Sequence, residues 1–102
     1  MAKVLNKHKD VIPDDAVYIG RPSKWGNPYV IGKDGTREEV IKKYALYAGG
    51  HFGMGELAEL YGKDLVCFCS PQPCHGDVLI DMSQMAINFM ELAEKVKRGL
   101  NG

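Results

Sequence analysis

The stretch CFCSPQPCHGD, residues 67–77, holds all three cysteines of the chain and one of its three histidines. Thiolate sulfur and imidazole nitrogen are good zinc ligands, and a thiol beside a histidine is also a typical nucleophile. The segment KDLVCFC (63–69) is predicted to be a buried strand, and a helix is predicted to begin near Asp77. Cys69, Cys74 and His75 therefore lie at a strand-to-helix turn, where α/β sheets usually bind ligands.

Three interpretations of this cysteine cluster remain open. In the first, Cys69, Cys74 and His75 bind zinc, with Cys67 or His51 as a fourth ligand, although the C-x-C and C-x4-C-H spacing is unusual for structural zinc. In the second, Cys74 is a nucleophile and His75 an acid or base, and the helix N-terminus binds an anion and lowers the pKa of the thiol. In the third, the cysteines only fill the core, which is the expected role of Cys67 in the middle of the strand.

A second group of polar residues lies in RPSKWGNPY (21–29), where two prolines and a glycine predict a shaped loop after the strand AVYIG (16–20). Arginine, lysine and serine suit a phosphate or carboxylate, and tryptophan offers a face on which a base can stack. The predicted ligand-binding residues are Arg21, Ser23, Lys24, Trp25 and Asn27. Alternatively, Trp25 fills one side of the core and Asn27 bonds the backbone across a turn. Arg21 faces the same sheet edge as the cysteine cluster if the two strands are parallel.

Length and composition limit the possible classes of protein. A chain of 102 residues with 45% hydrophobic and 25% charged residues fits one globular domain, residues 1–102. Thirteen basic residues balance thirteen acidic ones, so any binding of nucleic acid must come from a local patch. No apolar run approaches the roughly 20 residues of a membrane helix, and the N-terminus lacks the apolar core of a signal peptide. We therefore expect a cytoplasmic protein with reduced cysteines and no membrane association.

Helical patterns complete the predicted fold. TREEV predicts a helix capped by Thr36 and Glu39 that ends at the glycines 49–50, and a shorter helix is predicted over 55–62. YVIG (29–32) is a candidate short strand. The last helix is predicted to run from Asp77 to about Arg98. Its apolar stripe is Val78, Met82, Met85, Phe89, Leu92 and Val96.

These elements predict a compact α/β domain, in which a small sheet of three to four strands is packed by two to three helices. The distal part of the last helix, residues 82–102, is expected to overhang the domain. Its apolar stripe is a candidate surface for a homodimer.

Several stretches together resemble a family of small proteins from bacteria and their phages that is catalogued as a domain of unknown function. The stretches are NKHKD, VYIGRPSKWGNPYVIG, GTREEVI, GKDLVCFC and PCHGDVL, which cover about residues 4–81. The family usually carries Trp where Phe68 stands. The resemblance implies a phage or bacterial cytoplasmic setting but no reaction. It also implies that the polar residues of these loops form a shared site, namely Arg21, Ser23, Lys24, Trp25, Asn27, Arg37, Cys69, Cys74, His75 and Asp77.

The sequence thus supports two functional hypotheses. In the first, the domain binds a phosphate-bearing ligand, a nucleotide or nucleic-acid component, at its strand-end loops, with Cys74 and His75 as catalytic candidates if it is an enzyme. In the second, it is a zinc-stabilised module of phage or bacterial origin that binds a protein partner through the last helix.

Overall fold

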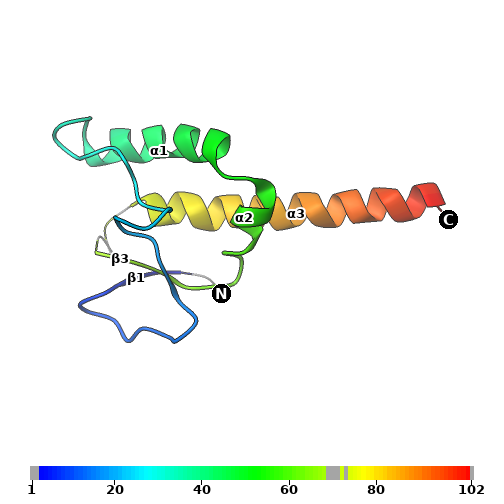
Figure 1. The fold of residues 1–102 in the computed structure, drawn as a ribbon, viewed down its shortest axis with the longest axis horizontal. Coiled ribbons are helices and arrows are strands. Elements are labelled where there is room, and N and C mark those ends of the chain that lie inside the picture. Colours follow the sequence, from blue (N-terminus) through cyan, green and yellow to red (C-terminus); the bar gives the residue numbers. More distant parts are fainter. Residues whose placement is uncertain (1–2, 69–71, 73, 102) are drawn as a thin grey trace.

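The chain folds into an α/β domain with a three-stranded parallel sheet. The computed structural model describes residues 3–68, 72 and 74–101. Its elements follow in the order β1 (Val4–Asn6), β2 (Val17–Tyr18), α1 (Arg37–His51), α2 (Met54–Ala58), β3 (Leu65–Cys67) and α3 (His75–Asn101). In Figure 1, α3 lies between the strands and α1, and α2 lies beside it. The predicted α/β class, with its small sheet and long C-terminal helix, is confirmed.

Strand β3 is the centre of the sheet. It pairs in parallel with β1 on one side and β2 on the other. The strands before the two predicted site loops are therefore parallel neighbours, so their carboxyl ends meet at one edge. The sequence did not predict β1. The strand predicted over 29–32 is wrong, because Ile31 forms only an isolated bridge with Gly35.

Helix α1 begins as its sequence predicts and ends later. The Thr36 hydroxyl accepts from the backbone N–H of Glu39 at 3.2 Å, and the Glu39 carboxylate accepts from the N–H of Thr36 at 2.9 Å, which forms the predicted capping box. The two glycines at 49–50 do not stop the helix. It continues to the cap residue Phe52, which is buried and donates its N–H to Ala48 O at 3.0 Å.

Helix α3 begins two residues earlier than predicted, because its first turn packs against the sheet. A β-carbon on Gly76 would lie 2.8 Å from side-chain atoms of Ile19 and of Val4, so only glycine permits this close approach. The buried face of α3 consists of His75, Leu79, Ser83 and Ala86. Val78 and Met82 of the predicted apolar stripe are partly buried and pack against the core, whereas Met85, Phe89, Leu92 and Val96 are exposed.

The distal half of α3 projects from the rest of the domain (Figure 1). Every residue from 88 to 99 is exposed, including Phe89, Leu92 and Val96. The homodimer through this surface stays a prediction. No helix in the described part of the chain is long and apolar enough to cross a membrane.

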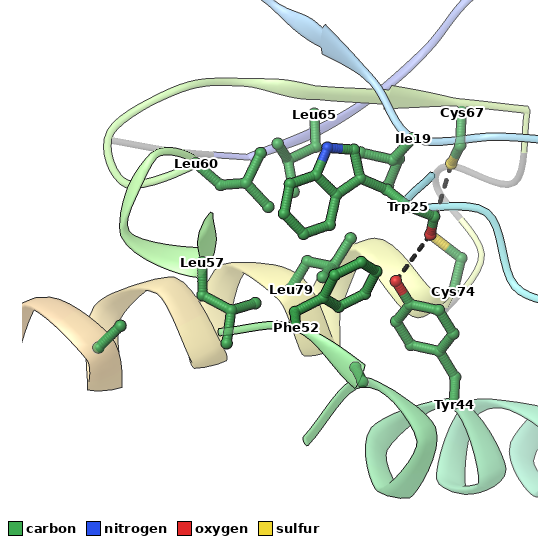
Figure 2. Packing of buried hydrophobic residues seen from close by; sticks show 12 residues of the cluster. Ile19, Trp25, Tyr44, Phe52, Leu57, Leu60, Leu65, Cys67, Cys74 and Leu79 are labelled. Carbon is green, nitrogen blue, oxygen red and sulfur yellow. Dashed lines mark hydrogen bonds between the residues drawn. The ribbon is translucent and has the colours of Figure 1, made fainter. Parts of the chain in front are cut away.

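Tyr44 links the core to the loop that follows β2. It is completely buried, and its hydroxyl donates a hydrogen bond to the backbone carbonyl of Trp25 at 2.7 Å (Figure 2). Burial raises the pKa of the Tyr44 hydroxyl, so the group stays protonated and keeps this bond. Trp25 packs beside it against Phe52, with ring centroids 4.5 Å apart.

We predict that Tyr44→Phe lowers the free energy of unfolding by about 1–2 kcal/mol, because it leaves the buried carbonyl of Trp25 without its donor. Urea unfolding would measure the loss. Tyr61→Phe is the matched control, since Tyr61 is 46% exposed and its change should leave the unfolding midpoint nearly constant. Equal stability of the two variants would contradict this role of Tyr44.

Candidate functional site

A cavity of about 390 Å³ lies at the carboxyl ends of β2 and β3. Its wall also includes the start of α1, the loop before that helix and the first turn of α3. The described residues that line it are Tyr18, Gly20, Arg21, Asn27, Tyr29, Val30, Ile31, Arg37, Val40, Ile41, Cys67, Phe68, Cys74 and His75. The two loops that the sequence singles out thus face one cavity.

The charged residues among the described lining of the cavity are all positive. Arg21 and Arg37 contribute two guanidinium groups, and no Asp or Glu is among the described residues of the lining. Arg21 is exposed and makes no salt bridge with a residue that the structure describes. The described lining of the cavity therefore carries positive charge, although the total charge of the chain is balanced.

Hydrogen bonds hold the loop after β2 in a defined shape. The Tyr18 hydroxyl donates to Arg21 O at 3.0 Å, and the peptide bond that follows Arg21 is cis. The Asn27 amide donates to Val40 O at 3.2 Å, and its oxygen accepts from Tyr29 N at 2.9 Å. Asn27 therefore bonds the backbone, as the alternative interpretation expected, and it still lines the cavity.

The remaining predicted ligand-binding residues lie elsewhere in the loop. Among the described residues, Ser23, Lys24 and Trp25 are not part of the cavity wall. Trp25 is only 5% exposed and belongs to the core, in agreement with the packing alternative. Lys24 is exposed, forms a 3.1 Å salt bridge with Glu56, and lies over the Trp25 ring with Nζ 4.8 Å from its centroid. Their roles in binding stay predictions.

Cys74 is the capping residue of α3. Its Sγ accepts from Gly76 N at 3.2 Å, and its own N–H donates to the Asp77 carboxylate at 3.1 Å. The Cys74 Sγ also lies 3.4 Å from the Cys67 Sγ, with both side chains buried (Figure 2). Cys67 is in the core as expected, but it also lines the cavity beside Cys74, which the sequence did not predict.

His75 ties the start of α3 to the end of β2. Its Nε2 lies 2.7 Å from Ile19 O, and because a carbonyl only accepts, Nε2 carries the proton. The ring is 7% exposed and packs edge-on against Tyr44 with centroids 4.9 Å apart. Burial lowers the pKa of His75, so the ring is neutral near pH 7. Its assignment as a catalytic acid or base stays a prediction.

The zinc interpretation falls partly outside the described residues, because Cys69 is not among them. Within residues 3–68, 72 and 74–101, no group of three or more His, Cys, Asp or Glu side chains is arranged to hold a metal ion. His51, considered as a fourth ligand, stacks on Tyr47 with centroids 4.7 Å apart and does not line the cavity. Zinc binding therefore stays a prediction.

Sequence reasoning missed a third loop at the same edge of the sheet, the one that follows β1. Asn6 is 6% exposed, and its side chain donates to Phe68 O at 3.2 Å and accepts from His8 N at 2.9 Å. Asn6 N in turn donates to the Asp10 carboxylate at 2.7 Å. The signal was the polar NKHKD directly after the apolar pair at 4–5, which has the form of a strand-end loop.

The fold and this cavity define a small parallel α/β domain with a cationic site at the carboxyl edge of its sheet. Residues 3–85 match the family described as a domain of unknown function, DUF4326, and the chain belongs to that family. The resemblance inferred from the sequence motifs is therefore confirmed.

Two relatives come from viruses. The chain is 39% identical over 85 residues to "Uncharacterized 12.4 kDa protein in nrdA-td intergenic region" of Enterobacteria phage T4, with 78% of this chain and 74% of the relative covered. It is 28% identical over 103 residues to "Uncharacterized protein R718" of Acanthamoeba polyphaga mimivirus, with 83% and 79% covered. No solved structure shows significant similarity.

Because His75 is buried and neutral, we predict that the folded protein loses stability in acid. Its pKa is lowered below the ordinary value of 6.5, so at lower pH the unfolded chain binds more protons than the folded one. The free energy of unfolding should therefore fall as the pH drops below 6.5, by at most about 1.4 kcal/mol at pH 5.5 from this residue.

Urea unfolding at pH 7.5 and 5.5 tests this prediction against His75→Gln, whose amide can still donate to Ile19 O but does not titrate. The variant should lose less stability on acidification than the unaltered protein. An equal loss in both proteins would mean that His75 does not cause the effect.

Proposed function

We propose that the cavity at the carboxyl edge of the sheet binds a phosphate-bearing ligand, a nucleotide or nucleic-acid component. The observation that carries this proposal is the pair Arg21 and Arg37 on a wall with no carboxylate among its described residues. Guanidinium groups form charge-assisted, bidentate hydrogen bonds with phosphate oxygens. Both arginines line one cavity, and the proposal assigns both to the phosphate of one ligand.

The helix ends support the same ligand class. The wall includes Arg37 from the first turn of α1, and Cys74 and His75 from the start of α3. A helix N-terminus carries a partial positive charge, and here two such ends accompany two cationic side chains. Both helix starts lie where parallel α/β sheets usually bind their ligands, although Glu39 and Asp77 each accept a hydrogen bond there.

The size and walls of the cavity fit a small organic phosphate better than an inorganic ion. A volume of about 390 Å³ is within the range of small-molecule sites, roughly 300–1,000 Å³. Tyr18, Tyr29 and Phe68 supply aromatic surface on the wall, suited to a sugar or base. The hydrogen bond from the Tyr18 hydroxyl to Arg21 O holds the Arg21 backbone in position before the ligand arrives, which reduces the entropy cost of binding.

The proposal assigns direct ligand contacts to Arg21, Arg37 and Asn27. Ser23, Lys24 and Trp25 would act through the shape of the loop. In an enzyme, Cys74 would be the nucleophile, because the N–H of Gly76 and the start of α3 stabilise a negative charge on its sulfur. Binding itself requires no catalytic step.

Calorimetric titration with nucleoside monophosphates tests the proposal. We expect Arg21→Gln and Arg37→Gln each to weaken binding about tenfold or more, because each removes charge-assisted hydrogen bonds to phosphate. Lys42→Gln is the matched control, since it removes the same charge from α1 at a side chain that is 75% exposed and outside the lining. Equal weakening by all three variants, or no binding of any nucleotide, would overturn the proposal.

The alternative of a zinc-stabilised interaction module has its own test. Two ligands of one tetrahedral zinc ion have sulfurs about 3.8 Å apart, and the Cys67 and Cys74 sulfurs are 3.4 Å apart. If this alternative holds, protein purified without added metal retains close to one zinc per chain, and a chelator lowers the unfolding temperature. A zinc content near zero would exclude the alternative.

A further inference from the structure

A cluster of aromatic and cationic side chains lies at the rim of the cavity. We call it the Phe68 cluster; its members are Lys7, His8, Tyr18 and Phe68. The Phe68 ring centroid is 5.0 Å from that of His8 and 6.1 Å from that of Tyr18, which meets it edge-on. The Lys7 ammonium lies 5.0 Å from the Tyr18 centroid and 5.8 Å from the Phe68 centroid. The cluster thus combines ring faces with positive charge.

The Phe68 cluster is built from all three strand ends. Lys7 and His8 follow β1, Tyr18 ends β2, and Phe68 follows β3. Two hydrogen bonds join the ends of β1 and β3, from the Asn6 side chain to Phe68 O at 3.2 Å and from Lys7 N to Cys67 O at 2.9 Å. The position of the cluster is therefore set by the sheet and not only by contacts between exposed side chains.

Phe68 is poorly explained as a packing residue. It keeps 48% of its surface exposed and is not part of the core cluster, although it directly follows a strand in which every residue is buried. Phe68 and Tyr18 also line the cavity with Arg21, so the exposed ring and the cationic wall are continuous. A ligand with a phosphate at Arg21 can therefore reach Phe68 with the group attached to that phosphate.

We infer that Phe68, supported by Tyr18, Lys7 and His8, stacks on the nucleobase of the ligand whose phosphate the cavity binds. This inference rests on the proposed function and assigns the residues that contact the base of its ligand. Stacking on an exposed aromatic ring accepts any base, and Lys7 adds attraction to the backbone phosphates of the same ligand. The buried Trp25 cannot take this role without leaving the core.

The test compares ligands with and without a base. The probes are adenosine, guanosine, cytidine and thymidine monophosphates, ribose 5-phosphate, and a 5′-phosphorylated six-nucleotide DNA strand. We expect the unaltered protein to bind nucleotides about tenfold more tightly than ribose 5-phosphate. Phe68→Leu keeps an apolar side chain without a π face, and it should weaken nucleotide binding about tenfold and leave ribose 5-phosphate binding unchanged. Phe68→Trp, which has a π face, should keep the preference for nucleotides over ribose 5-phosphate that Phe68→Leu loses.

The outcomes separate this inference from the proposed function. If Arg21→Gln weakens nucleotide binding and Phe68→Leu does not, phosphate binding stands and the stacking inference is overturned. If the unaltered protein binds none of the probes, both are overturned. If the DNA strand binds more tightly than the mononucleotides and Phe68→Leu weakens its binding, the inference is supported and the base belongs to a nucleic acid. If a mononucleotide binds more tightly than the DNA strand and Phe68→Leu weakens its binding, the inference is supported and the base belongs to a free nucleotide.

Discussion

The hydrogen bond from His75 Nε2 to Ile19 O is the interaction on which the site depends. It joins the first turn of α3 to the backbone just after β2, and both residues are buried. Gly76 makes the approach possible, because a β-carbon there would clash with the side chains of Val4 in β1 and of Ile19 just after β2. Tyr44 binds the same loop from α1 through Trp25 O. Side chains from two helices thus replace the strand partners that this loop lacks.

This arrangement explains how a chain with balanced charge can have a cationic cavity. The polar side chains that shape the site, His75, Asn27 and Tyr44, are neutral or bonded to the backbone, so they add no charge of their own. Asp77 is exposed, its carboxylate accepts from Cys74 N at 3.1 Å, and it is not among the described residues of the wall. Among the described residues of the lining, Arg21 and Arg37 therefore carry the charge, and both charges are positive.

Local signals in the sequence predicted some elements well and others poorly. The capping box of α1 and the strand that ends at Cys67 depend on neighbouring residues, so both were predictable from short segments. β1 was not, because a three-residue strand in a lysine-rich segment is stabilised by its pairing with β3, 61 residues away. The two predicted site loops share an edge only through that parallel pairing. The contact between Cys67 and Cys74 depends on how the chain folds in three dimensions, and so does the exposure of Phe68. The spacing of residues in the sequence predicts neither.

Helix α3 divides into two parts with different constraints. Its last buried residue is Ala86, and the family match ends at residue 85, so the packed part of the helix and the shared part of the sequence coincide. The 27-residue helix is about 40 Å long, and its first turn forms part of the cavity wall. Its far end therefore has no part in shaping the site. A fluorophore or affinity tag placed there would report on the protein, or immobilise it, with the cavity facing away from the attachment.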